Sequence, residues 1–328
     1  EEIKEEEKEI KEEEIKKEEE EIKKEEEIKK EKIKKEEIKE EEKEIKEEEI
    51  KKEEEIKKEE EKIKKEEEEI KEEEEIITIA ILIKNKSLTL PLFLKCIENQ
   101  TFSKKYINLY IRSNNNTDNS IEIINEWLHK NKSFYNEIYT DFTDVEEKIE
   151  IYGEHEWNST RFKILGKIRE ESIKWALEKK SHYFTVDCDN FIKKDTLEKI
   201  YNLNLPIVSP FIKNNAKDMH ANFFTSVDDI GYPKKDNIYI EIFNENIKGL
   251  IIMPIVHCIY LIRKEYLNLM KYSDLTPRYE YVIFSENARN KNVAQYLDNR
   301  ELYGYLTFAE NEGDFSKEKE NWDKKIFF

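Results

Sequence analysis

Two carboxylates separated by one residue, Asp187-Cys188-Asp189, are the side chains of this sequence best suited to hold a metal ion. They follow residues 183–186, an apolar segment that predicts a buried strand. Carboxylates at a strand end can both reach one divalent cation, and a hard cation can bridge them to a diphosphate. The alternative is that these residues form only a turn, followed by a helix whose N-cap is Asp195. Their position at the end of a strand favours the metal site.

Two further residues stand in settings that suit chemistry. His257 lies within residues 253–262, an apolar segment that predicts one strand. A lone histidine there is usually a core residue bonded to a backbone carbonyl, but as a third ligand it would complete an oxygen and nitrogen set suited to Mn²⁺. Glu280 opens the apolar segment 280–284. It is either a first-turn glutamate favoured by the helix dipole or a general base.

The elements that position these residues alternate along the chain. Strands are expected at residues 76–83, 106–111, 134–139 and 183–186, and helices at 88–97, 120–128 and 159–180. This alternation predicts an α/β domain with a mainly parallel sheet, in which ligands bind at the carboxyl ends of the strands. The loops after Ile83, Ile111 and Val186 are therefore the expected site.

Residues 1–75 differ sharply from the rest, because they contain only 40 Glu, 23 Lys and 12 Ile. Ion pairs four residues apart would support a helix of about 110 Å. The isoleucines recur at intervals of 5, 6 or 7 residues and drift around the helix, whereas a coiled coil needs two apolar positions per heptad. A long charged single helix or a disordered spacer is the simpler interpretation. Self-association through a coiled coil is the alternative.

Residues 76–328 are expected to form one domain. They carry 35 basic and 37 acidic side chains, so the acidic balance belongs to the charged segment and no basic patch suggests a nucleic-acid partner. The three cysteines, Cys96, Cys188 and Cys258, show no metal-type spacing. No apolar run is long enough to span a membrane. The absence of a signal peptide and of paired cysteines favours a soluble, cytoplasmic protein.

Several segments of residues 76–306 resemble, in order and approximate spacing, the N-terminal glycosyltransferase domain of the procollagen galactosyltransferases. These enzymes transfer galactose to collagen hydroxylysine. The segments are AILIKN (80–85), LPLFL (90–94), EWL (126–128), WNSTRF (157–162), DCDNF (187–191), IVSP (207–210), PIVH (254–257) and NRELYGYL (299–306). The resemblance implies a GT-A, Rossmann-like fold that uses UDP-galactose with Mn²⁺ or Mg²⁺. It also makes the ER lumen the alternative compartment.

The resemblance also assigns residues to roles. Asp187 and Asp189 would hold the metal on the donor diphosphate, with His257 as a further ligand. A basic series on the helix before the metal motif would contact phosphate or order the nucleotide loop; it consists of Arg161, Lys167 and Arg169. Asn116 and Asp118 lie in a loop that would hold uracil and ribose. Spaced basic residues on a helix are also typical of a solvated face.

The sequence departs from the resembled family in three places. The family has two adjacent acidic residues where this chain has Tyr279-Glu280, so Glu280 alone remains as the candidate base. A second transferase-like domain usually follows in the family, and residues 1–75 have no counterpart there. The acceptor, a collagen-like protein or a glycan, is therefore open. The alternatives are a UDP-glucose-using or glycan-modifying transferase, and an inactive, transferase-like binding module on a charged stalk.

Overall fold

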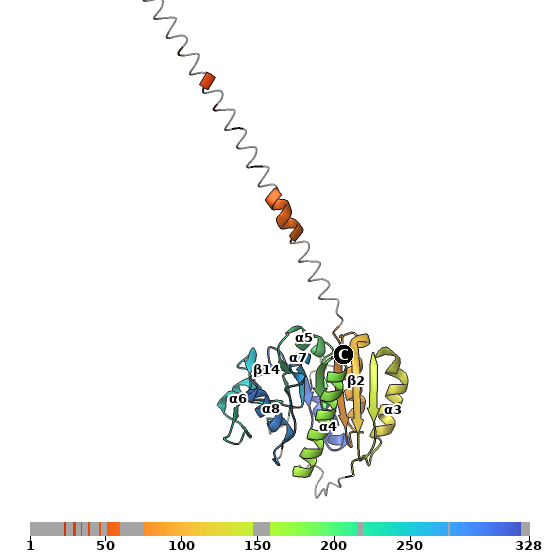
Figure 1. Ribbon diagram of the computed structural model, residues 1–328. Helices are drawn as coiled ribbons and strands as arrows, with labels where there is room; N and C mark the ends of the chain where they lie inside the picture. Colours follow the sequence, from red (N-terminus) through yellow and green to blue (C-terminus); the bar gives the residue numbers. More distant parts are fainter. Residues whose placement is uncertain are drawn as a thin grey trace, which may run out of the picture. The chain divides into compact units, whose positions relative to one another are not determined.

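The computed structural model describes residues 23, 29–30, 34, 39, 46, 51–59, 75–146, 158–215, 219–274 and 276–322. The chain divides into two compact units, residues 1–74 and 75–328. The described residues of the first unit are helical, and residues 51–59 form the orange helix in Figure 1. The predictions for residues 1–75, a single helix, a disordered spacer or a coiled coil, concern residues that lie mostly outside the described part of the chain.

The second unit is built on an eight-stranded sheet with the order β11-β14-β6-β13-β4-β1-β2-β3 (Figure 1). Four neighbouring pairs are parallel: β1 with β2, β1 with β4, β2 with β3, and β6 with β14. β13 and β11 run antiparallel to their neighbours. The prediction of an α/β fold with a mainly parallel sheet is confirmed. The strands span β1 Ile77–Ile83, β2 Ile107–Ser113, β3 Glu137–Asp141, β4 His182–Val186, β6 Ile207–Pro210, β11 Leu250–Ile252, β13 Ile259–Ile262 and β14 Gln295–Asp298.

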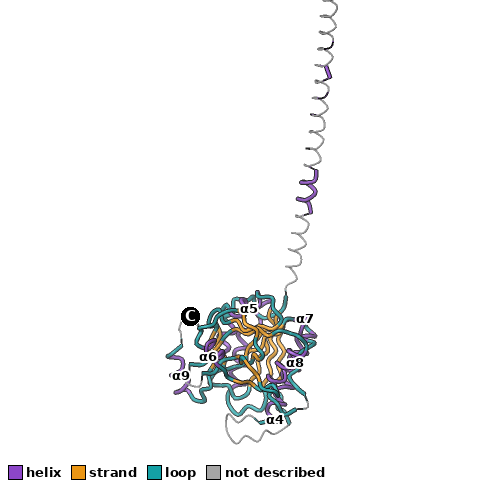
Figure 2. Tube along the Cα trace, turned by 90° about the vertical axis from the view of Figure 1, so that its left-hand side faces the viewer, coloured by secondary structure: helices purple, strands orange, loops and turns teal. Residues whose placement is uncertain are grey.

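Helices cover both faces of this sheet (Figures 1 and 2). The isoleucines at alternate positions of β1 pack into one core with α2, α3, α5 and α9, whereas Ala80 faces a second core with α4, α6 and α8. Burial on both faces explains why the central strands are rich in β-branched residues. The helices span α2 Leu90–Glu98, α3 Ser120–Asn131, α4 Ser159–Glu178, α5 Thr196–Asn202, α6 Asn237–Phe243, α7 Lys264–Leu267, α8 Glu280–Asn290 and α9 Glu312–Glu320. Short 3₁₀ helices span Lys104–Tyr106 and Lys132–Phe134.

The helix that matters most for the site is α4. The predicted helix over residues 159–180 matches it within two residues. Asn158 caps it, because the Asn158 side chain accepts a hydrogen bond of 2.9 Å from the Arg161 backbone nitrogen. Gly166 allows the helix to lie close to the loop before α8, where a Cβ at this position would come within 2.8 Å of the Tyr272 carbonyl oxygen. α4 thereby lies close against the loop before α8.

Residues 253–262 do not form the single strand that was predicted. They form β12 (Ile255–Val256) and β13, which are separated by His257 and Cys258. Cys258 has a φ of +65°, a left-handed conformation that ends one strand and redirects the chain. β13 then joins the main sheet, whereas β12 pairs with β8 (Phe223–Phe224). Polarity gave no sign of this break, because residues on both sides are apolar.

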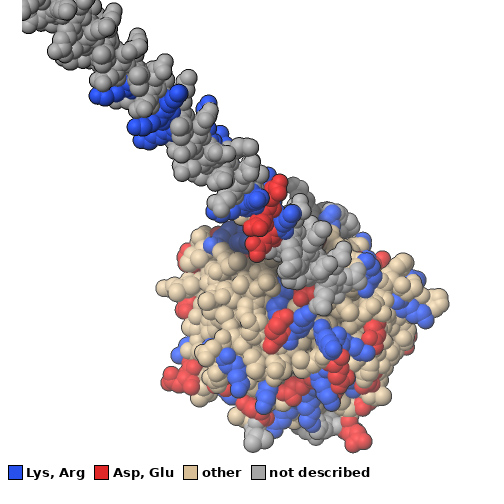
Figure 3. Space-filling model, turned by 45° about the horizontal axis from the view of Figure 1, so that its top comes forward, with Lys and Arg blue, Asp and Glu red and all other residues tan. Residues whose placement is uncertain are grey.

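Three small sheets complete the described part of the domain. β5 (Asn190–Ile192) and β7 (Ile212–Lys213) flank β15 (Gly304–Leu306), β12 pairs with β8, and β9 (Ser226–Val227) pairs with β10 (Pro233–Lys234). In the described part of the chain, no helix is long and apolar enough to cross a membrane. The three cysteines are unpaired. On the face in Figure 3, acidic and basic side chains are interspersed.

Candidate active site

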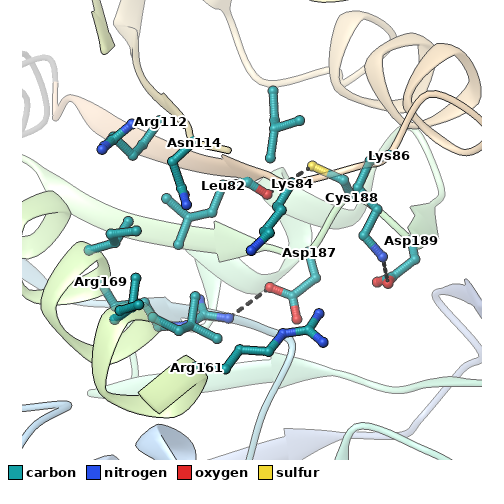
Figure 4. Close-up of a pocket in the computed structure, with 14 residues that line it drawn as sticks. Leu82, Lys84, Lys86, Arg112, Asn114, Arg161, Arg169, Asp187, Cys188 and Asp189 are labelled. Atoms are coloured by element: carbon teal, nitrogen blue, oxygen red, sulfur yellow. Dashed lines mark hydrogen bonds and ion pairs between the residues drawn. The ribbon is translucent and has the colours of Figure 1, made fainter. Parts of the chain in front are cut away.

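A cavity lies at the carboxyl ends of β1, β2 and β4, beside the first half of α4 (Figure 4). This is the position in which open parallel sheets bind ligands, and it includes residues from the three loops that the sequence singled out. Charged side chains of both signs line it together with aliphatic ones. The lining residues are Leu82, Ile83, Lys84, Lys86, Arg112, Asn114, Arg161, Ile164, Leu165, Ile168, Arg169, Asp187, Cys188 and Asp189.

The Asp187-Cys188-Asp189 segment is held at the end of β4 by backbone hydrogen bonds to the residue before β13 and the residue after β15. The Asp187 nitrogen donates to the Cys258 oxygen at 3.0 Å, and the Thr307 nitrogen donates to the Asp189 oxygen at 3.1 Å. The Cys188 side chain is buried and donates to the Leu82 oxygen, so it faces the end of β1. Both carboxylates remain partly exposed toward the cavity, at 30% for Asp187 and 24% for Asp189.

Each of the two carboxylates is paired with a different cation. A nitrogen of the Arg169 guanidinium lies 2.8 Å from an Asp187 oxygen, and the Lys86 ammonium lies 2.5 Å from an Asp189 oxygen. Arg169 also donates to the Thr185 hydroxyl at 2.8 Å. Burial disfavours the charged form of Arg169, but Asp187, Glu280 and the neighbouring tyrosines together outweigh burial and raise the pKa of the guanidinium. Arg169 therefore stays charged and orients Asp187.

Two more cations, Lys84 and Arg161, line the same cavity, and Figure 4 shows both side chains extending toward Asp187. Burial lowers the pKa of Lys84, and the nearby positive charge of Arg161 lowers it further. Burial also lowers the pKa of Arg161. Like charges held together in a half-buried cavity repel each other, and a multiply charged anion would relieve that repulsion.

Glu280 is the first residue of α8, and Arg169 contacts both Glu280 and Asp187. One of its oxygens is 3.8 Å from the Arg169 Nε atom, and the other is buried without a hydrogen-bond partner. Burial raises the pKa of Glu280 to about 7, although Arg169 opposes the shift. A carboxyl group with this pKa can both accept and release a proton near neutral pH. Glu280 does not line the cavity itself.

His257 occupies the break between β12 and β13. Its ring lies 5.4 Å from the Phe224 ring and 5.1 Å from the Tyr281 ring, and its Nε2 atom is buried without a partner. Burial and, to a smaller extent, the neighbouring His220 lower the pKa of His257 to about 3. The imidazole is therefore neutral at physiological pH, which is the form that binds metals.

The residues present offer a donor set that suits a hard divalent cation. In the described part of the chain, no group of three or more His, Cys, Asp or Glu side chains is arranged to hold a metal. His257 is therefore not gathered with the two carboxylates here. However, cations that act with phosphate ligands are usually held by only one or two protein carboxylates, since the substrate and water supply the other oxygens. Asp187 and Asp189 meet that requirement, and the ammonium of Lys86 already occupies a cation's place beside Asp189.

Three of the expected binding residues lie away from the cavity. The Asn116 side chain accepts from the Asn85 backbone nitrogen at 2.8 Å, and the Asp118 side chain accepts from Ser87 at 2.8 Å. These bonds tie the loop after β2 to the loop after β1, so both residues shape the cavity from outside. Lys167 is exposed on α4 and does not line the cavity. Their assignment to nucleotide contacts stays a prediction.

The structure adds four polar residues to the candidate site. Lys84 and Lys86 follow β1, and Arg112 and Asn114 lie at the end of β2. Arg112 is buried and its Nε atom lies 3.3 Å from an Asp141 oxygen. The signal available in the sequence was the pair of lysines directly after the first apolar segment, which lies in one of the loops expected to form the site.

Comparisons with known proteins bear on the family of the domain. The family model for the glycosyltransferase family 25 N-terminal domain matches residues 74–322. Procollagen galactosyltransferase 1 of Danio rerio is 30% identical over 242 residues, which are 70% of this chain and 39% of that protein. Procollagen galactosyltransferase 2 of Homo sapiens is 30% identical over 245 residues, 70% of this chain and 38% of that protein. The chain thus spans about two fifths of the length of these relatives.

Solved structures show a more distant likeness. Residues 1–349 of TarS from S. aureus align with a TM-score of 0.47 and 15% identity, covering 71% of this chain and 60% of that one. A mannosyltransferase from Pyrobaculum calidifontis aligns with a TM-score of 0.44 and 11% identity, covering 72% and 58%. Neither score bears on function. The family match and the α/β sheet with its site at the strand ends agree with the predicted GT-A, Rossmann-like class. The chain belongs to glycosyltransferase family 25, through residues 74–322 that match the N-terminal domain of that family.

Proposed function

We propose that this domain transfers a sugar from a UDP-sugar to a hydroxyl group of an acceptor, with Mn²⁺ or Mg²⁺ on the donor diphosphate. The observation that carries the proposal is the cavity at the strand ends, where Asp187 and Asp189 lie beside the cations Lys84 and Arg161. Two carboxylates select a metal ion and two cations select an anion. A metal-bound diphosphate satisfies both requirements.

In this proposal the cavity binds the UDP-sugar donor and its cation. Asp187 and Asp189 would hold the cation, and His257 stays a candidate for a further ligand. When bound, the cation would neutralise the charge that develops on the leaving diphosphate. Lys84 and Arg161 would bind the phosphate oxygens and add to that stabilisation. Arg169 would keep the Asp187 carboxylate in one orientation.

At the acceptor end, Glu280 is the proposed general base. It would take the proton of the acceptor hydroxyl while that oxygen attacks the sugar carbon and the bond to the UDP oxygen breaks. A single displacement of this kind inverts the configuration at the sugar carbon. The support for this role is the pKa of about 7 and the unpartnered buried oxygen of Glu280.

Galactose is the proposed sugar and a collagen-like protein the proposed acceptor. The support is that the two relatives described above, each matched over 70% of this chain, are named procollagen galactosyltransferases. Because the chain spans about two fifths of those relatives, hydroxylysine as the acceptor group and the ER lumen as the compartment belong to the proposal. Specificity between galactose and glucose depends on a few contacts in the pocket.

A donor screen tests the proposal. We expect UDP-galactose and UDP to raise the melting temperature of the protein in the presence of Mn²⁺ and not in EDTA. Transfer to a peptide that contains hydroxylysine, measured as UDP release, should follow and should be lost in the Asp187→Ala, Asp189→Ala double variant. If UDP-glucose stabilises the protein and UDP-galactose does not, the transferred sugar is glucose and not galactose. Binding without turnover on peptide or glycan acceptors would favour a binding module, and unchanged turnover in the double variant would refute the metal assignment.

A further inference from the structure

The two cations paired with the metal motif differ in their freedom to move. The Arg169 side chain is 4% exposed and also contacts Thr185 and Glu280, so leaving Asp187 would break several buried contacts. The Lys86 side chain is 33% exposed, and its partner Asp189 is 24% exposed. A lysine carries a point charge on a flexible four-carbon stem, whereas an arginine guanidinium is rigid and bound in fixed directions. Lys86 is therefore the exchangeable cation.

The ammonium of Lys86 occupies the coordination space that a metal ion needs. It lies 2.5 Å from an Asp189 oxygen, whereas Mg²⁺ would bind that same oxygen at about 2.0–2.1 Å, so the two cations cannot occupy this position together. The ammonium also donates a hydrogen bond to this oxygen. A metal ion can bind this oxygen of Asp189 only after the ion pair opens.

The opening of the pair is unfavourable in the absence of an anion. A divalent cation and the released Lys86 ammonium would then share a cavity with Lys84 and Arg161, and all of these groups are positive. A nucleoside diphosphate reverses the balance, because its oxygens bind the metal and attract the lysine in the same cavity. The metal and the diphosphate should therefore each strengthen the binding of the other.

We propose that Lys86 is a positioning residue that makes metal binding depend on the nucleotide diphosphate. It holds Asp189 when the diphosphate is absent and transfers to the diphosphate when the metal takes its place. This inference rests on the proposed function, since it assumes that the cavity binds a metal and a nucleoside diphosphate. It predicts that the protein alone binds Mn²⁺ weakly and binds it tightly with UDP.

The test measures Mn²⁺ binding by electron paramagnetic resonance of the free ion, with and without saturating UDP. In the unmodified protein we expect UDP to tighten Mn²⁺ binding at least tenfold. Lys86→Gln removes the competing charge, so Mn²⁺ binding without UDP should tighten about tenfold and the effect of UDP should shrink by a similar factor. Lys86→Arg keeps the charge and should bind Mn²⁺ without UDP no more tightly than the unmodified protein.

Lys199→Gln is the matched control. Lys199 also lies 2.5 Å from a carboxylate oxygen, that of Glu301, but it belongs to α5 and does not line the cavity. This variant should bind Mn²⁺ and UDP as the unmodified protein does. Melting curves of all variants establish that each is folded before it is compared.

The possible outcomes separate the two proposals. If UDP does not bind with or without Mn²⁺, the proposed function fails. If UDP binds and Mn²⁺ binding without UDP is the same in Lys86→Gln as in the unmodified protein, the role of Lys86 is refuted and the proposed function stands. If UDP binds equally well in EDTA and Mn²⁺ never binds, Lys86 replaces the metal permanently, and the exchange is refuted.

Discussion

Asp187 and Asp189 lie two residues apart, but they pair with different cations, Arg169 and Lys86, so replacing each carboxylate by alanine leaves a different cation without its partner. Asp187→Ala would leave the buried Arg169 charge, which is 4% exposed, without its partner, whereas Asp189→Ala would release Lys86, whose side chain is 33% exposed. Loss of one partner of a buried ion pair typically costs about 3 kcal/mol, and loss of an exposed pair about 0.5 kcal/mol. Urea unfolding should therefore show a clear loss of stability for Asp187→Ala and almost none for Asp189→Ala. Equal losses would contradict the anchoring role of Arg169.

Glu280 gives a prediction about pH. Its pKa of about 7 means that the proton acceptor is mostly protonated below that pH. If Glu280 is the base, the transfer rate at saturating donor should rise about tenfold per pH unit below pH 7 and level off above it. Glu280→Gln should lower the rate at least a hundredfold, with donor binding preserved. A variant that keeps both its rate and the rising limb would exclude Glu280 as the base.

The same pKa has a consequence for stability. In the unfolded chain the Glu280 carboxyl ionises near its ordinary pKa of 4.5, and in the folded protein it ionises near 7. Between these values the folded state holds a proton that the unfolded state has lost. The free energy of unfolding therefore falls as the pH rises from about 4.5 to 7 and is constant above that range, as far as this group is concerned. Glu280→Gln should remove this part of the pH dependence.

The sequence located Asp187 and Asp189 in the cavity but not all of their neighbours. Their place could be predicted because a strand end is a local feature, visible as an apolar segment followed by polar residues. The pairing of Lys86 with Asp189 joins residues that are 103 positions apart, and depends on β1 and β4 lying side by side. The resemblance pointed to Asn116 and Asp118 in the loop after β2, but Asn114 of that region lines the cavity instead. The difference could not be predicted, because the direction in which a loop side chain points depends on contacts with distant parts of the chain.

Among the elements, β15 should be the most sensitive to a small change. A Cβ at Gly304 would lie 2.0 Å from the Phe191 carbonyl oxygen, so a side chain there cannot coexist with the pairing of β15 and β5. Because β5 begins directly after Asp189, which lines the cavity, Gly304→Ala should lower the melting temperature by several degrees and weaken UDP binding. Gly313→Ala in α9 is the control, since its Cβ would meet only the end of the Asn311 side chain.

The expected result for that control is unchanged or slightly increased stability, because alanine favours a helix over glycine by up to about 1 kcal/mol. Both variants can be compared by thermal unfolding and UDP titration. A Gly304→Ala protein as stable as the Gly313→Ala protein would show that β15 and β5 can separate without affecting the domain.

At this scale the sequence predicted which elements exist better than how they pair. Continuous β-branched segments and amphipathic segments predicted β1, β2, β4 and α4 within a few residues. The antiparallel insertion of β13 between β4 and β6 was not predictable, since it follows from the left-handed turn at Cys258. A cysteine does not mark such a turn in the way that a glycine would.

At the scale of the whole molecule, every residue that lines the cavity belongs to the second unit, residues 75–328. A chain that lacks residues 1–74 should therefore bind UDP and Mn²⁺ with the affinity of the full chain, provided that Glu75 is kept. Glu75 accepts a hydrogen bond of 2.7 Å from Tyr201 and lies 2.6 Å from His182. Isothermal titration checks the affinity, and light scattering of both chains tests self-association. A large loss of UDP affinity would give residues 1–74 a part in the site.

The most direct test of the account is UDP binding to the unmodified protein and to Asp189→Ala, each measured by isothermal titration with Mn²⁺ and with EDTA. We predict that Mn²⁺ tightens UDP binding to the unmodified protein at least tenfold, which is about 1.4 kcal/mol. The Asp189→Ala protein, with its fold intact, should lose that gain. UDP affinity that is the same in all four measurements, or no UDP binding at all, would contradict a metal-bound nucleotide at Asp187 and Asp189.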